Sequence, residues 1–138
     1  SREAARYISQ HFDRDIPIAC DIDYAGSAVA AYLDRPMYYI CRREMGTFIL
    51  WDKKHRVGLS GDELLRGPMN LIDSTHKQAL LLVDYPLNGV PPVFNVTVPQ
   101  SFGLGSKPDV FRFEWMKAIS ASNVPDEQYL ILSVTKVQ

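Results

Sequence analysis

Apolar positions recur at helical spacing in three segments of the chain. In each segment an apolar residue returns every three or four positions, so that the apolar side chains gather on one face of a helix. The second segment stops at a proline, which cannot continue a helix, and the third begins with a serine whose hydroxyl can cap it. The predicted helices span residues 3–12 and 24–33 and a segment that begins at residue 60.

Short apolar and β-branched runs alternate with these helices and predict strands. The most apolar of them is the run from Ala79 to Val83. In the last third of the chain, extended runs are separated by loops rich in proline and glycine, and the final two runs form the pattern of an antiparallel hairpin. The predicted strands cover residues 16–20, 37–41, 47–51, 79–83, 93–98, 110–119 and 128–137, with residues 42–46 as a polar connector.

This order of elements predicts the fold class. Helices and strands alternate through the first two thirds of the chain, which favours a three-layer α/β domain with a mainly parallel sheet, extended by the C-terminal antiparallel hairpin. A length of 138 residues fits one domain, because single domains most often contain about 100–150 residues. We therefore expect residues 1–138 to form a single soluble α/β domain.

Composition and charge exclude several classes of protein. The chain is 46% hydrophobic and 22% charged, and its 15 basic and 16 acidic residues give a net charge of −1. Without a basic stripe interleaved with aromatic residues, we expect no binding to nucleic acid. No apolar run approaches the roughly 20 residues of a membrane-spanning helix. The chain opens directly on a helical pattern, as a domain excised from a longer protein would.

Two acids and an aromatic residue follow the first predicted strand. These residues, Asp21, Asp23 and Tyr24, lie where the strand predicted at 16–20 ends and the next predicted helix begins. In open α/β sheets, ligands bind beyond the carboxyl ends of the strands, so these residues are candidates for ligand binding. In the alternative interpretation, Asp23 caps the helix by accepting main-chain N–H bonds and Asp21 satisfies a loop. Both interpretations stay open at this point.

A second group of candidates follows the next two predicted strands. Arg42 and Arg43 come after residues 37–41. Trp51 is the last residue of the strand predicted at 47–51, and Asp52 follows it, just before further basic residues. One interpretation is a solvated loop. The other is contact with an anionic head group, since arginine forms charge-assisted hydrogen bonds with phosphates.

The sequence contains no pattern typical of a metal, cofactor or catalytic site. Its three histidines are scattered, and Cys20 and Cys41 belong to no CxxC motif. The small residues Gly26, Ser27 and Ala28 lie inside a predicted helix, where they allow close packing against a sheet instead of forming a nucleophile elbow. We expect Cys20 and Cys41 to be buried thiols, because a disulfide between adjacent parallel strands requires awkward geometry.

Several runs resemble a known family in their order along the chain. The runs are REAARYI, PIACDIDYAGSAVAAYLDRPMYYI, GTFILWD, ALLLVDYPL and PDEQYLILSV. In this order they resemble the soluble C-terminal region of bacterial membrane glycosyltransferases of the protein-mannosyltransferase (dolichyl-phosphate-mannose-type) class. The resemblance spans nearly the whole chain, and it rests on the pattern of strands and on signatures such as DYAGSAVAAYLDRP, not on a catalytic motif.

The resemblance implies a setting for the chain. Members of this class are multi-pass enzymes that move a sugar from a polyprenyl-phosphate carrier to an acceptor outside the membrane, and their catalytic acid lies in a loop that this chain lacks. The chain would then be a non-catalytic domain on the extracytoplasmic face of a bacterial inner membrane. Its partners would be the membrane-embedded part of the same chain and an acceptor or a polyprenyl-phosphate head group. No catalytic residue carries over.

A second hypothesis comes from a different functional class. The chain could instead be an independent α/β domain that binds or hydrolyses a small ligand in a pocket beyond the first strand. The coding sequence upstream of Ser1 separates the two hypotheses, because only the first requires a series of apolar helices there.

Overall fold

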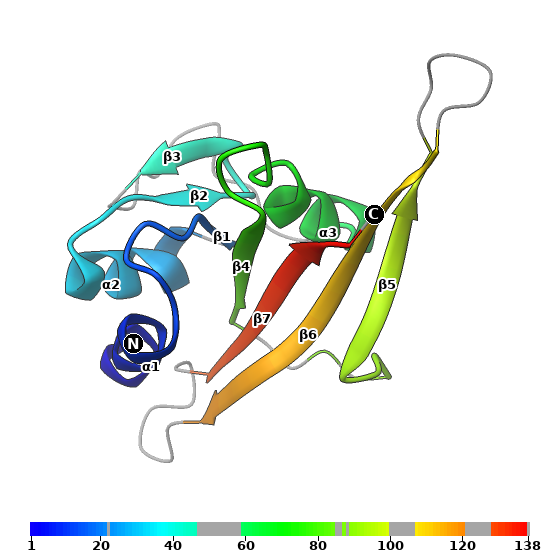
Figure 1. Cartoon of the computed structure of the whole chain (residues 1–138). Coiled ribbons are helices and arrows are strands. Elements are labelled where there is room, and N and C mark those ends of the chain that lie inside the picture. Colours follow the sequence, from blue (N-terminus) through cyan, green and yellow to red (C-terminus); the bar gives the residue numbers. More distant parts are fainter. Residues whose placement is uncertain are drawn as a thin grey trace.

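The computed structural model describes residues 1–21, 23–46, 59–84, 87, 89–99, 107–120 and 128–137. These residues form an α/β fold with three helices and a seven-stranded mixed sheet (Figure 1). The helices are α1 (Arg2–His11), α2 (Asp23–Leu33) and α3 (Gly61–Met69). The strands are β1 (Ile18–Cys20), β2 (Met37–Tyr39), β3 (Glu44–Gly46), β4 (Gln78–Val83), β5 (Val93–Val98), β6 (Asp109–Ser120) and β7 (Gln128–Lys136). Their order in the sheet is β3-β2-β1-β4-β7-β6-β5.

The sheet is mostly antiparallel, so the prediction of a mainly parallel sheet is wrong. Only β1 runs parallel to its neighbours β2 and β4, and the other four neighbouring pairs are antiparallel. A parallel pair needs a long crossover, and α2 supplies one between β1 and β2. The short segment between β2 and β3 can form only a hairpin. The predicted C-terminal antiparallel pair is present as β6 and β7, which extend the sheet beyond β4.

The strand β3 lies where the sequence predicts a polar connector. Its residues Glu44–Gly46 pair with β2 through a turn in which Arg43 adopts a positive φ of 56°. A strand of three residues with no apolar run leaves no signal in the hydrophobic pattern. The strand predicted at residues 47–51 lies outside the described residues.

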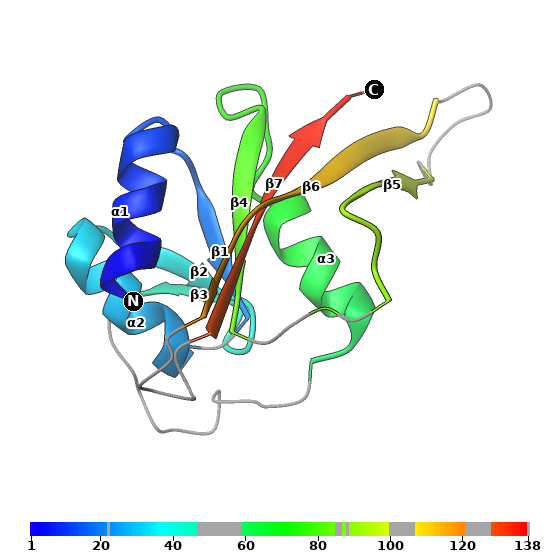
Figure 2. The same ribbon diagram turned by 90° about the horizontal axis from the view of Figure 1, so that it is seen from below.

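Helices lie on both faces of the sheet, and Figure 2 shows α1 and α2 on one side with α3 on the other. The strand β4 is buried on both faces, because side chains along a strand point alternately to either side. Leu80 packs in the same cluster as Val29 of α2, whereas Leu81 packs with Leu64 of α3. Two apolar clusters therefore hold the helices to the sheet.

Small residues let the helices approach the sheet closely, as the sequence predicts for α2. A Cβ atom added at Gly26 would lie 2.8 Å from Sγ of Cys20 and 2.9 Å from Cε1 of Tyr39. Such distances are shorter than normal van der Waals contacts. Glycine at this position therefore sets how close α2 lies to β1 and β2.

The predicted serine cap of the third helix is confirmed. Oγ of Ser60 accepts a hydrogen bond from the main-chain N–H of Glu63 at 3.1 Å, and the Glu63 side chain reaches back to the main-chain N–H of Ser60. This reciprocal pair is a capping box, which satisfies two donors that the first turn of a helix would otherwise leave unpaired. Within the described part of the chain, no helix has the length and apolarity needed to cross a membrane.

Candidate functional site

The residues predicted as candidates fall at different places in the structure. Asp21 directly follows β1, and Asp23 and Tyr24 are the first two residues of α2, with side chains outside the described part. The prediction that Asp23 caps α2 therefore stays a prediction. Arg42 and Arg43 lie in the turn between β2 and β3. The remaining two candidates, Trp51 and Asp52, lie outside the described residues.

Asp21 joins three chain segments at the carboxyl ends of the parallel strands. The residue is 3% exposed. Its Oδ2 accepts a hydrogen bond from the main-chain N–H of Asp84 at 3.3 Å, and its Oδ1 lies 3.5 Å from the donor Sγ of Cys20. Its main-chain N–H donates to the carbonyl of Leu82, and its carbonyl accepts from the N–H of Cys41. The carboxyl group of Asp21 therefore joins the ends of β1 and β4, and its main chain joins β1 to the turn after β2.

The pKa of Asp21 is far from its ordinary value. Burial raises this pKa from 3.8 to about 8, and the neighbouring carboxyl of Asp84 contributes in the same direction through a side-chain hydrogen bond and its charge. Hydrogen bonds from the Asp84 main chain and the Cys20 thiol act in the opposite direction. Shifts of this size occur in catalytic sites and also in buried structural networks. Because Asp21 is almost wholly buried and its oxygens are engaged, the structural role fits better.

The two arginines of the second group do not form a common site. The side chain of Arg42 is 2% exposed, and its Nε and Nη2 lie 3.0 and 2.9 Å from Oε1 of Glu44. Arg43 is exposed, with Nη2 3.7 Å from Oε2 of Glu63 at the start of α3. Arg42 therefore supports the β2–β3 hairpin, and Arg43 lies at the surface.

Cys20 and Cys41 are both buried thiols, which confirms the sequence prediction. Over the described ranges, no group of three or more histidine, cysteine or acidic side chains is placed to hold a metal ion. Neither finding adds a chemical function to the carboxyl ends of the strands.

A pocket of about 440 Å³ lies elsewhere, between α1 and the C-terminal end of α2. We call it the arginine pocket. It is separated from Asp21 by α2, which begins two residues after Asp21 and is about 16 Å long at the usual rise per residue. Its lining residues are Arg2, Ala5, Arg6, Ile8, Ser9, Asp13, Arg14, Tyr32, Leu33 and Arg35.

Arg35 lines this pocket and is held in place by main-chain carbonyls. Its Nη1 donates to the carbonyl of Arg14 at 2.6 Å, and its Nη2 donates to the carbonyl of Ile16, two residues before β1. Partial burial lowers the pKa of Arg35, whereas the charge of Asp15 raises it. Arginine stays charged in proteins, so the guanidinium ties the loop after α1 to the end of α2 and keeps its charge at the pocket.

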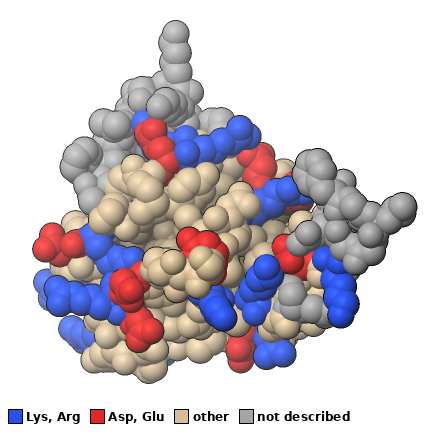
Figure 3. Space-filling view, turned by 45° about the horizontal axis from the view of Figure 1, so that its top comes forward, with Lys and Arg blue, Asp and Glu red and all other residues tan. Residues whose placement is uncertain are grey.

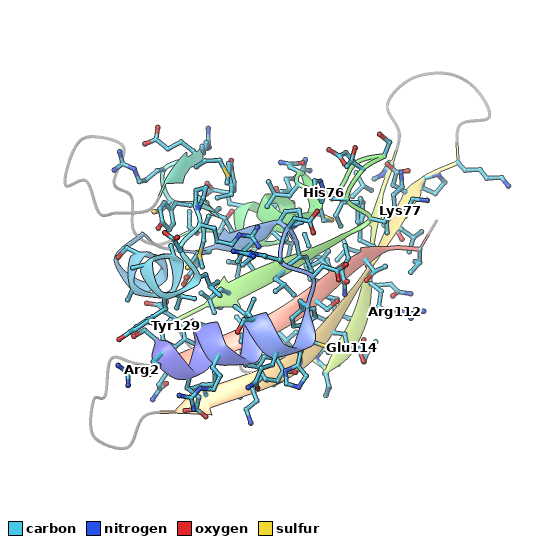
Figure 4. All side chains as sticks on the ribbon, turned by 60° about the vertical axis from the view of Figure 1, so that its left-hand side comes forward. Arg2, His76, Lys77, Arg112, Glu114 and Tyr129 are labelled. Carbon is cyan, nitrogen blue, oxygen red and sulfur yellow. The ribbon has the colours of Figure 1, made fainter. Side chains whose placement is uncertain are left out.

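Arg2 and Tyr32 form the outer wall. Figure 4 shows Arg2 at the start of α1, the helix in the foreground. Its guanidinium carbon lies 5.6 Å from the centroid of the Tyr32 ring, within the range of a cation–π interaction. Tyr32 is 54% exposed, so its ring presents an aromatic surface to solvent at the pocket.

Sequence reasoning missed the arginine pocket because its charged residues come from three separate segments. The one local signal is on α1, where Arg2 and Arg6 are four residues apart and therefore share a helix face. That face lies beside the buried residues Ala5 and Ile8. Arg14 and Arg35 join it only through the packing of α1 against α2.

The comparisons with known proteins give no relative for the chain. No protein-family model matches it. A search of curated proteins gives no match, and no solved structure matches its fold.

Proposed function

We propose that the chain is a non-catalytic extracytoplasmic domain of a polyprenyl-phosphate-sugar-dependent membrane glycosyltransferase. In this role it would pack on the membrane-embedded part of the same chain or help an acceptor, or the polyprenyl-phosphate head group, to reach it. The proposal takes the class of parent protein from the sequence resemblance. We also infer that its helices and its mostly antiparallel sheet make up a three-layer α/β domain.

One observation carries the non-catalytic part of this proposal. The edge of the sheet where open α/β folds bind ligands is occupied by the chain's own groups. Asp21 is 3% exposed and its two carboxyl oxygens are hydrogen-bonded to Asp84 and Cys20. A general acid or base must come within hydrogen-bond reach of its substrate. A carboxyl group buried in this way favours a structural role.

The alternative is an independent domain that binds or hydrolyses a small ligand beyond β1. It requires a pocket lined by Asp21, whereas the arginine pocket lies at the far end of α2. The alternative nevertheless makes a distinct prediction about the gene and about activity, so one pair of experiments separates it from the proposal.

The first experiment is to read the coding sequence upstream of Ser1. The proposal expects a series of apolar segments of about 20 residues each, the length that spans a bilayer. A start codon close to Ser1 would contradict it.

The second experiment is an activity assay of the isolated domain with a lipid-phosphate-sugar donor, an acceptor and common ester and phosphate substrates. We expect no turnover. Activity that survives repurification and is lost in Asp21→Asn would support the alternative instead.

A further inference from the structure

The arginine pocket has the size and composition of a small-molecule site. Its volume of about 440 Å³ falls within the roughly 300–1,000 Å³ of typical ligand pockets. Three of its lining residues, Ala5, Ile8 and Leu33, are apolar, and Tyr32 adds an aromatic ring. Arginines complete the lining, as expected of a pocket that holds an organic group and orients it with a few charged side chains.

The charges of the lining residues are strongly unbalanced. Four arginines line the pocket with one acid, Asp13. Within the described part of the chain, none of these arginines forms an ion pair with a carboxylate, although Asp15 acts on Arg35 from a greater distance. By contrast, on the face shown in Figure 3 basic and acidic side chains lie interspersed. The concentration of positive charge is therefore a property of this pocket and not of the whole surface.

The pocket is partly organised before any ligand binds. Arg35 uses two of its five N–H donors on the carbonyls of Arg14 and Ile16, which fixes the guanidinium and leaves the other donors for a ligand. Donors held in place by the protein lose less conformational entropy when an anion binds.

We propose that the arginine pocket binds a phosphate-bearing ligand, either a phosphate ester or a diphosphate. The organic part of this ligand would lie against Tyr32 and the apolar lining residues. Guanidinium groups match phosphate oxygens in geometry and form paired, charge-assisted hydrogen bonds with them. A group with two or more negative charges suits an excess of three positive charges among the lining residues better than a single carboxylate does. The ligand could be a soluble phosphate compound or the head group of a phosphate-linked lipid. The inference rests on the pocket alone and holds whether or not the chain belongs to a transferase.

Isothermal titration with inorganic pyrophosphate tests this site. The informative variant is Arg6→Ala with Arg14→Ala, because both side chains are exposed and form no hydrogen bond or ion pair in the described part of the chain. Arg35 is unsuitable, since it also holds the loop after α1. The control is Arg112→Ala, which removes an exposed arginine from β6, outside the pocket (Figure 4).

We expect the wild-type domain to bind pyrophosphate and the double variant to bind it at least about tenfold more weakly, the equivalent of about 1.4 kcal/mol. The Arg112→Ala control should bind as the wild type does. The affinity of the charge-conserving variant Arg6→Lys with Arg14→Lys for pyrophosphate should lie between those of the wild type and the double alanine variant. Lysine keeps the positive charge but lacks the planar guanidinium that forms paired hydrogen bonds with phosphate. Thermal unfolding of all variants checks that they are folded.

A second titration with a short-chain prenyl diphosphate separates the two sources of the ligand. Tighter binding than that of pyrophosphate identifies a lipid head group, and equal binding identifies a soluble phosphate compound; each result supports the site. The inference is overturned if pyrophosphate does not bind, or if the double variant and the Arg112→Ala control bind it equally well. Neither result bears on whether membrane-spanning segments lie upstream, so the proposed function is tested separately.

Discussion

The main-chain N–H of Asp84 donates a hydrogen bond to Oδ2 of Asp21 over 3.3 Å, so that the ends of β4 and β1 meet at one buried carboxyl group. These two parallel strands end at the edge where many α/β proteins bind their ligands. In this chain the edge is closed by contacts between its own residues. The stability of the fold should therefore depend on the protonation of Asp21.

We expect the free energy of unfolding to fall as the pH rises from about 4 to about 8. Burial raises the pKa of Asp21 from 3.8 to about 8, so in this range the folded chain keeps a proton that the unfolded chain has lost. The folded state then binds more protons than the unfolded state. Its extra stability is complete below about pH 4 and is lost as the pH approaches 8, by at most about 1.4 kcal/mol per pH unit from this group.

Urea unfolding of wild type and Asp21→Asn across this pH range measures the effect. The asparagine stays neutral and its oxygen can still accept the Asp84 N–H, so we expect a much flatter dependence on pH in the variant. The matched control is Asp62→Asn, which neutralises an exposed acid paired with Arg66 on α3. If the stability curves of wild type and Asp21→Asn run parallel, the pKa of Asp21 is not raised in the folded state.

Replacing Gly26 by alanine should destabilise the protein. The added Cβ would lie 2.8 Å from Sγ of Cys20 and within 3 Å of the Tyr39 ring, so α2 or the sheet must shift. Overpacking of this kind usually costs about 1–3 kcal/mol, and the better helix propensity of alanine offsets up to about 1 kcal/mol of it. We expect a net loss of about 1–2 kcal/mol in chemical unfolding.

The matched control for this prediction is Gly61→Ala. Gly61 is also a helical glycine, but a Cβ built there has no neighbour within 4 Å among the described residues. Its replacement should leave stability unchanged or increase it slightly. Equal effects of the two substitutions would show that close packing of α2 is not the reason for glycine at position 26.

The two cysteines should react only when the chain unfolds. Cys20 and Cys41 are both 0% exposed, so an aromatic disulfide reagent cannot reach either thiol in the native protein. In denaturant without reductant, we expect two reactive thiols per chain. A value of zero would reveal a disulfide, and rapid reaction of the native protein would show that the site around Cys20 opens.

Local patterns predict the helices well, because a helix depends on residues close in sequence. The expected helix at 3–12 is shifted by one residue from α1 (Arg2–His11), and the expected helix at 24–33 begins one residue after α2 (Asp23–Leu33) does. Strand direction depends instead on which segments pair across the sheet. The strand Glu44–Gly46 exists through its pairing with β2, and β7 lies antiparallel to β4 although the two are far apart in sequence.

The candidate site also combines features that depend on nearby residues with features that depend on pairing across the sheet. The position of Asp21 at the end of a strand is predicted correctly, but its partner Asp84 is missed, although Asp84 directly follows the predicted strand 79–83. Adjacent parallel strands bring these two acids to the same edge, and only the pairing of β1 with β4 reveals it. The arginine pocket is missed for a similar reason, since Arg6 and Arg35 meet only after α1 packs on α2.

The central claim is that the binding function lies in the arginine pocket and that the Asp21 edge is structural. Amide NMR spectra recorded during titration with pyrophosphate test this claim residue by residue. We predict that the largest changes occur in α1, in Asp13 and Arg14 and in residues 32–35, while the signals of Asp21, Asp84 and the β2–β3 turn stay in place. Changes centred on Asp21 and Asp84, with the arginine pocket unaffected, would contradict the claim and identify the carboxyl ends of β1 and β4 as the binding site.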